Sequence, residues 1–268
     1  MRVHTKQKNA LLGVVVFALF LPVLLGIPVL AEEEPAYIYV TVANADGTLV
    51  LAQAAIPLRD ADGDGALTVH DALLCAHDAG YAGGASAGYA AEQTEGGLSA
   101  TLLWGAPTDG YGCYINHVPT DDLLSPVQEE DQVYAFVSAD PEILYCYFDV
   151  SRASVAGEEP LTLTLASVGY DGDGEVIVSP VADAVIRIDG KNTAFSTDAE
   201  GRVTLQFDGS GSCVISAWKD GVALMPPVCT VAVSGEDPAA GDRSALRWVL
   251  LSVAALAVLV FAIRRRRR

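Results

Sequence analysis

The stretch from Arg59 to Leu73, RDADGDGALTVHDAL, sets the expected fold of the first half of the chain. Its acidic residues fall at every second position, Gly65 ends the acidic run, and a helical pattern of apolar residues follows. Alternating carboxylates before such a glycine are typical of a loop that wraps a hard cation. An acidic turn that caps a helix begins in the same way, so the stretch has two interpretations.

The metal interpretation places an oxygen donor at every ligand position of a calcium loop. With Asp60 in the first position, Gly65 falls where the chain must turn tightly, and the Ala66 carbonyl falls where a main-chain oxygen binds. Calcium takes roughly six to eight oxygens at about 2.4 Å. The sequence therefore predicts one Ca²⁺ held by Asp60, Asp62, Asp64, the Ala66 carbonyl, Thr68 and Asp71.

The capping interpretation uses fewer of these residues. Thr68 followed three positions later by Asp71 is a capping box, in which both side chains bind free helix amides without a metal. A capping box does not account for the three alternating acids that precede it, which repel one another unless a cation lies between them.

Both ends of the chain are apolar and flanked by basic residues. Basic residues precede the apolar run 10–31, which predicts a signal peptide over 1–31, with an uncleaved anchor as the alternative. Trp248 to Ile263 is apolar apart from Ser252 and is followed by Arg264 to Arg268, which predicts a single-pass membrane anchor over 247–268. The rule that positive charge stays inside places the region between them outside the cell.

This exported region is strongly acidic. It holds all 34 acidic residues of the chain and seven of its 16 basic ones, a net charge of about −27. Such a charge excludes binding of nucleic acid or anionic lipid through bulk electrostatics, and it makes divalent cations plausible partners.

Two blocks are expected between the ends, with a boundary at 150. Residues 32–150 contain a hairpin signal at Asn44 to Gly47, one amphipathic helix that Gly80 stops, and further strands that include 143–148, which together predict an α+β domain. Residues 151–233 contain short strands with alternating apolar residues, which predict an all-β sandwich. Cys213 and Cys229 face inward on two late strands of this sandwich, and we expect a disulfide between them.

Two stretches of the sequence match a catalytic or a metal-binding pattern by spacing alone. Gly84 to Gly88 satisfies G-x-S-x-G, but it follows a helix rather than a strand, so a glycine-alanine loop is the better interpretation. His70 and His77 lie seven apart on the helix, but no third zinc ligand can be named, which favours exposed helix histidines. No acid, base and nucleophile are assembled, and we therefore expect no enzyme.

Several segments resemble known families. The acidic loop resembles the EF-hand loop in its dockerin form, with Asp at the twelfth position. From Tyr37 to Asp149 the chain resembles the transcobalamin C-terminal-like, β-grasp domains of Gram-positive surface proteins, through that loop and the stretches 112–116 and 130–134. The segments 184–190 and 197–201 resemble bacterial immunoglobulin-like (Ig-like) surface modules. These resemblances imply a β-grasp-like domain followed by an Ig-like sandwich.

The segment 234–246 is a polar tether. Its residues 237–241, DPAAG, resemble the sortase signal LPxTG, but Asp replaces Leu and Ala replaces Thr, which favours a plain membrane anchor over wall attachment. We therefore expect a calcium-stabilised binding or adhesion protein on a bacterial cell surface, with a protein or glycan ligand. An extracellular enzyme or a dockerin-like component of an enzyme assembly is the alternative.

Overall fold

The computed structural model describes residues 36–234 apart from 109, 138–142, 157–158, 171 and 174, and these residues belong to one compact unit. The predicted signal peptide, membrane anchor and nearly all of the tether lie outside the described residues. Within the described ranges, no helix has the length and hydropathy of a membrane span.

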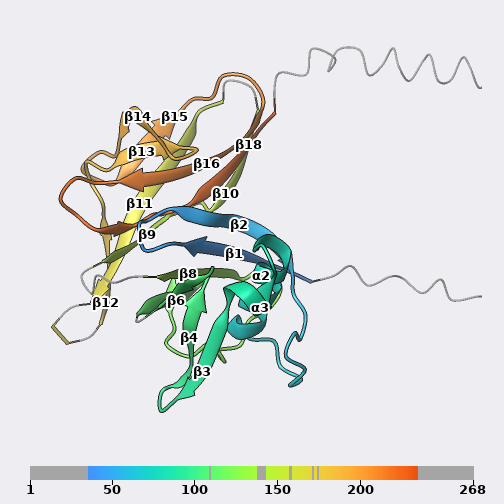
Figure 1. Ribbon diagram of the computed structural model, residues 1–268. Coiled ribbons are helices and arrows are strands. Elements are labelled where there is room, and N and C mark those ends of the chain that lie inside the picture. Colours follow the sequence, from blue (N-terminus) through green and yellow to red (C-terminus); the bar gives the residue numbers. More distant parts are fainter. Residues whose placement is uncertain are drawn as a thin grey trace, which may run out of the picture. The chain divides into compact units, whose positions relative to one another are not determined.

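The first block is built on a mixed sheet (Figure 1). Its strand order is β2-β1-β8-β6-β7, and the central strand β8 is parallel to its neighbour β1. The strands are β1 (Tyr37–Ala43), β2 (Leu49–Pro57), β6 (Tyr111–Ile115), β7 (Val118–Pro119) and β8 (Gln132–Val137). β1 and β2 form the predicted antiparallel hairpin across the turn that Asn44 begins.

One helix, α2 (Val69–Gly80), covers this sheet from the side of its apolar face. The predicted apolar positions Val69, Ala72, Leu73 and Ala76 are fully buried, in one core with Ile38, Val40 and Val133 of the sheet. The predicted helix and its packing face are therefore confirmed, because the apolar spacing that indicated the helix is also the spacing that it buries.

A small sheet in the first block was not predicted. It consists of β3 (Ala90–Thr94), β4 (Gly97–Leu103) and β5 (Ala106–Pro107), in that order. Only Ala100 and Leu103 of these strands are buried, and the small and polar residues of the strands show little of the apolar alternation that marks a strand.

The second block consists of two sheets that share an apolar core. One has the order β10-β18-β16-β13-β14 and the other the order β12-β11-β9-β17, with β15 paired to β11. The first sheet comprises β10 (Arg152–Ala156), β13 (Val185–Ile188), β14 (Lys191–Ser196), β16 (Gly211–Trp218) and β18 (Cys229–Ser234). The second comprises β9 (Leu144–Phe148), β11 (Leu161–Tyr170), β12 (Val176–Pro180), β15 (Arg202–Leu205) and β17 (Leu224–Met225). The block is all β, as the alternation of Val203 and Leu205 with polar residues predicts.

The strand β9 belongs to the second block, although its position in the sequence predicted that it belongs to the first. It pairs with β11 and with β17, and its residues Cys146 and Phe148 lie in the core of the sandwich. Apolar alternation indicates a strand but not the sheet in which the strand pairs. The boundary expected at 150 lies after β9, whereas the pairing of β9 places the change from one block to the other before this strand.

A third apolar cluster connects the two blocks. It combines Tyr134 and Phe136 of β8 with Tyr145 of β9, Met225 of β17 and Val228. The rings of Tyr134 and Tyr145 meet edge to face, with centroids 5.5 Å apart, and the Tyr134 hydroxyl donates a hydrogen bond to the carbonyl of Pro226. This shared core explains why the described residues form one compact unit.

We predict that Tyr134→Phe destabilises the protein by about 1 kcal/mol, because the ring stays packed while the buried Pro226 carbonyl loses its donor. Chemical unfolding of the full chain measures the change. Tyr37→Phe removes a hydroxyl from a residue that is 38% exposed and serves as the control. An unfolding free energy equal to that of the unmodified chain would contradict the role assigned to this bond.

Candidate metal site

The acidic loop brings three of the predicted ligands together. One carboxylate oxygen each of Asp60, Asp62 and Asp71 lies within 4.8 Å of the others. Asp64 is not part of this group. The predicted set is therefore gathered in part, with two residues from the loop and one from the first turn of α2.

Asp71 is the buried member of the group. Its side chain is fully covered, and its Oδ1 accepts hydrogen bonds from the amides of Ala61 at 2.7 Å and Asp62 at 3.4 Å. Its Oδ2 accepts from the amide and the hydroxyl of Thr68, at 3.0 and 2.8 Å. Burial alone would raise the pKa of this carboxyl, but the donors from Ala61, Thr68 and Asp62 hold it below its ordinary value of 3.8.

The capping box expected at the start of the helix is present. The Thr68 side chain accepts from the amide of Asp71, while the Asp71 carboxylate accepts from the amide of Thr68. Thr68 therefore has a structural role that needs no metal, as the capping interpretation predicts.

The other acids of the loop also accept main-chain hydrogen bonds. The two carboxylate oxygens of Asp60 accept hydrogen bonds from the amides of Gly63 at 2.7 Å and Gly65 at 3.0 Å. Asp62 and Asp64 each accept, through Oδ1, the amide two residues further on. These turns fix the orientation of the carboxylates, and they leave the Asp62 Oδ2 on the side of His70, whose Nε2 is 3.9 Å away.

His77 is not the exposed helix histidine that its sequence pattern predicted. It is fully buried, and its Nδ1 lies 2.6 Å from the Leu73 carbonyl, so this nitrogen carries the hydrogen. Its Nε2 accepts the amide of Trp104 at 3.0 Å. Both ring nitrogens are thus occupied, which leaves none for zinc. No sequence pattern predicted this contact, because Trp104 lies in the sheet region that was not predicted.

The G-x-S-x-G stretch is a helical turn, α3 (Ala85–Gly88), rather than the expected loop. The Asp78 carboxylate accepts the amide of Ala85 at 2.9 Å and thereby caps this turn. Ser86 is exposed, and its hydroxyl donates to the Gly83 carbonyl at 3.3 Å. The serine is therefore held by its own turn and not by a catalytic base.

Cys213 and Cys229 lie on the neighbouring strands β16 and β18. Cys213 is paired with Val231, and Cys229 with Ile215, so the two cysteines are diagonal neighbours rather than a directly opposed pair. Both are free thiols in the structure, and the bond predicted from the sequence is not formed there. Burial, the proximity of the two sulfurs and Asp149 raise the pKa of Cys229 to about 12.

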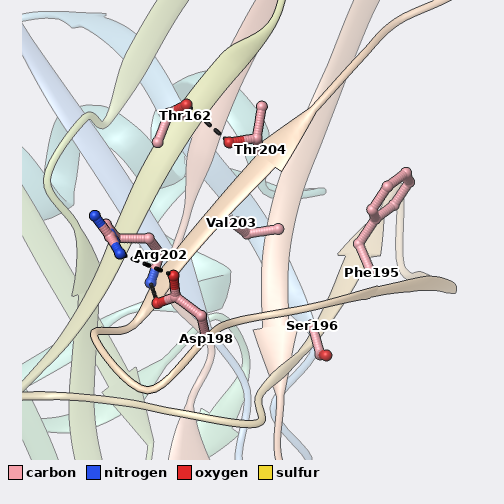
Figure 2. A pocket seen from close by; sticks show the side chains of 7 residues that line it. All are labelled: Thr162, Phe195, Ser196, Asp198, Arg202, Val203 and Thr204. Atoms are coloured by element: carbon pink, nitrogen blue, oxygen red, sulfur yellow. Dashed lines mark hydrogen bonds and ion pairs between the residues drawn. The ribbon is translucent and has the colours of Figure 1, made fainter.

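A shallow depression of about 530 Å³ lies on the second block (Figure 2). It is lined by Thr162, Phe195, Ser196, Asp198, Arg202, Val203 and Thr204. Its polar groups largely bind one another: the hydroxyls of Thr162 and Thr204 are 2.9 Å apart, and Arg202 pairs with Asp198 at 3.3 Å. Asp198 also accepts the amide of Arg202 at 2.8 Å, so this cluster holds a turn together.

Comparisons with known proteins give little further guidance. No protein-family model and no curated protein matches the chain. The chain is similar to the fibronectin(III)-like modules of CbhA from Clostridium thermocellum at 14% identity and a TM-score of 0.26, over 52% of this chain and 84% of that one. It is also similar to the N-terminal four Ig domains of Dscam1 at 13% identity and a TM-score of 0.22, over 75% of this chain and 45% of that one. These scores are low, and the fold described above rests on strand order and core packing.

We predict that acid destabilises the fold through His77. Burial lowers the pKa of His77 below its ordinary value of 6.5, so the folded protein binds fewer protons than the unfolded chain. The stabilisation is complete above pH 6.5 and is lost as the pH falls below it. Urea unfolding between neutral and mildly acidic pH should show this decline, and His77→Gln should reduce the slope.

His117 is the internal comparison for this measurement. Burial lowers its pKa as well, so His117→Gln should remove a separate part of the slope. An unfolding free energy that does not change with pH in this range would contradict both assignments.

The disulfide between Cys213 and Cys229 stays a prediction for the protein in an oxidising environment outside the cell. Closing this short loop would stabilise the sandwich by roughly 3 kcal/mol in the chain-entropy model. Non-reducing peptide mapping of the chain produced under oxidising conditions should find the two cysteines in one linked peptide. If both thiols react with an alkylating reagent, the prediction is wrong.

Proposed function

We propose that the chain is a calcium-stabilised, non-catalytic binding protein displayed on a bacterial membrane. The observation that carries the calcium part is the grouping of Asp60, Asp62 and Asp71 within 4.8 Å. The display part rests on the apolar and basic ends of the sequence, with the acidic region 32–246 outside the cell.

The proposal includes the domain types. We infer a β-grasp-like first domain, supported by a hairpin, a covering helix and a last strand that returns parallel to β1 in the middle of the sheet. We infer an Ig-like second domain, supported by two sheets that enclose one core. No such structural observation supports binding to a cohesin domain, which is the partner of dockerins.

The donor set fits a hard cation in part. Calcium prefers oxygen ligands, and the three grouped residues offer only carboxylate oxygens. Asp62 has an oxygen that takes no main-chain amide, whereas both oxygens of Asp71 already accept two hydrogen bonds each. In this proposal Asp60 and Asp62 contribute most of the binding, Asp64, Thr68, Asp71 and the Ala66 carbonyl complete the set, and the affinity is modest.

The non-catalytic part is supported by how the reactive side chains are used. Ser86 donates to a neighbouring carbonyl, and His77 has both nitrogens in hydrogen bonds. Burial raises the pKa of Cys113 and of Cys146 to about 12, which keeps both as unreactive thiols at neutral pH.

We predict that calcium raises the melting temperature of the full chain by several degrees. If the dissociation constant is ~10 μM and calcium is ~1 mM, binding adds about 2.7 kcal/mol of stability. Asp62→Asn should abolish this increase, because the asparagine oxygen can still accept the Asp64 amide while the charge is lost. Differential scanning calorimetry with calcium, magnesium and EDTA measures the effect, which should be smaller for magnesium.

Asp208→Asn removes the same charge from an exposed position outside the loop and is the matched control. It should keep the full response to calcium. Equal melting temperatures in EDTA and in millimolar calcium would leave the loop as an acidic turn before a capped helix. An array of glycans and proteins probed with the full chain, with and without calcium, tests the binding part.

A further inference from the structure

The strand β12 is an exposed apolar edge of the sandwich. It is the end strand of its sheet and pairs only with β11 among the described strands (Figure 1). All five of its residues are exposed, and three consecutive ones, Val176, Ile177 and Val178, are 57%, 43% and 54% exposed. Because successive residues of a strand point to opposite faces, this strand exposes apolar side chains on both faces.

The edge also offers main-chain hydrogen bonds. In an antiparallel pair, about half of the amide and carbonyl groups of an edge strand point away from its neighbour. Protein edges are usually protected by lysine, by proline or by very short strands. Here Pro180 lies at the last position of β12, opposite Ala166, so Val176 to Ser179 are left without such protection.

The charge of the molecule limits what can bind there. Glu175 directly precedes the strand and Asp173 lies in the turn before it, in a region of the chain with a net charge of about −27. A second copy of the chain would bring the same negative charge to the edge, which opposes self-pairing. An extended segment with basic residues would gain both the hydrogen bonds and a favourable electrostatic interaction.

We propose that β12 is a docking edge at which an extended, basic segment of a partner protein adds a strand to the sheet. Valine and isoleucine on the two faces of β12 would pack against apolar residues of that segment, while its basic residues face the acidic surroundings. This assigns a partner class to the proposed binding function and rests on it, but it does not depend on calcium.

The test uses the full chain and a synthetic peptide of alternating valine and lysine, with a glutamate-for-lysine peptide as the charge control. We expect the lysine peptide to bind equally in calcium and in EDTA, to bind more weakly at high salt, and to slow hydrogen exchange at 176–179. The double variant Val176→Thr, Val178→Thr keeps two β-branched residues and should weaken binding by about tenfold or more.

Val118→Thr is the matched control, because Val118 is 65% exposed on the edge strand β7, which has only two residues. It should leave binding unchanged. Equal binding of the two peptides, unchanged exchange at 176–179, or full binding by the double variant would overturn the proposal. Dimerisation of the chain without peptide, with protection of 176–179, would also overturn it in favour of a second copy. Failure of the calcium test alone would leave it standing.

Discussion

The first block depends on a buried carboxylate at the start of its helix. Asp71 is fully covered, and an uncompensated charge at such a position would cost several kcal/mol. Four hydrogen-bond donors from Ala61, Asp62 and Thr68 compensate it, and the positive end of the helix dipole adds to them. The same residue therefore ties the acidic loop to the helix and sets where the helix begins. From that point the apolar face of α2 is directed onto the sheet.

The second structural constraint is the core shared by the two blocks. β8 contributes Tyr134 and Phe136 to it from the centre of the mixed sheet, while Tyr145 and Met225 come from the second block. The guanidinium of Arg152 lies 3.1 Å from the centre of the Tyr39 ring and adds a cation–π contact between the blocks. β8 and β9 are consecutive strands in the sequence, and both contribute side chains to this core although they belong to different sheets. The two blocks are therefore packed against each other through this core.

The sequence predicted those features whose cause is local. The capping box at Thr68, the apolar spacing of α2 and the alternation around Val203 each reflect contacts within a few residues. The features it missed depend on distant partners: β9 pairs with β11, and His77 is covered by Trp104 and Tyr89, with ring centroids 4.8 and 5.1 Å away. For the two cysteines of the sandwich, one feature was predicted from the sequence and another was not. Alternation correctly placed Cys213 and Cys229 on inward faces, but the register that makes them diagonal neighbours is a property of the folded sheet.

The hydrogen bonds of the acidic loop also bear on what a cation could add. A carboxylate can accept about four hydrogen bonds, and the Asp71 carboxylate accepts four from protein donors alone. The start of the helix is therefore held by hydrogen bonds that need no metal. The amides of Gly63, Gly65 and Asp64 orient the carboxylates of Asp60 and Asp62. What these hydrogen bonds leave uncompensated is the repulsion among three carboxylates less than 5 Å apart. A bound cation would stabilise the domain by relieving that repulsion, whereas the hydrogen bonds at the start of the helix form without it.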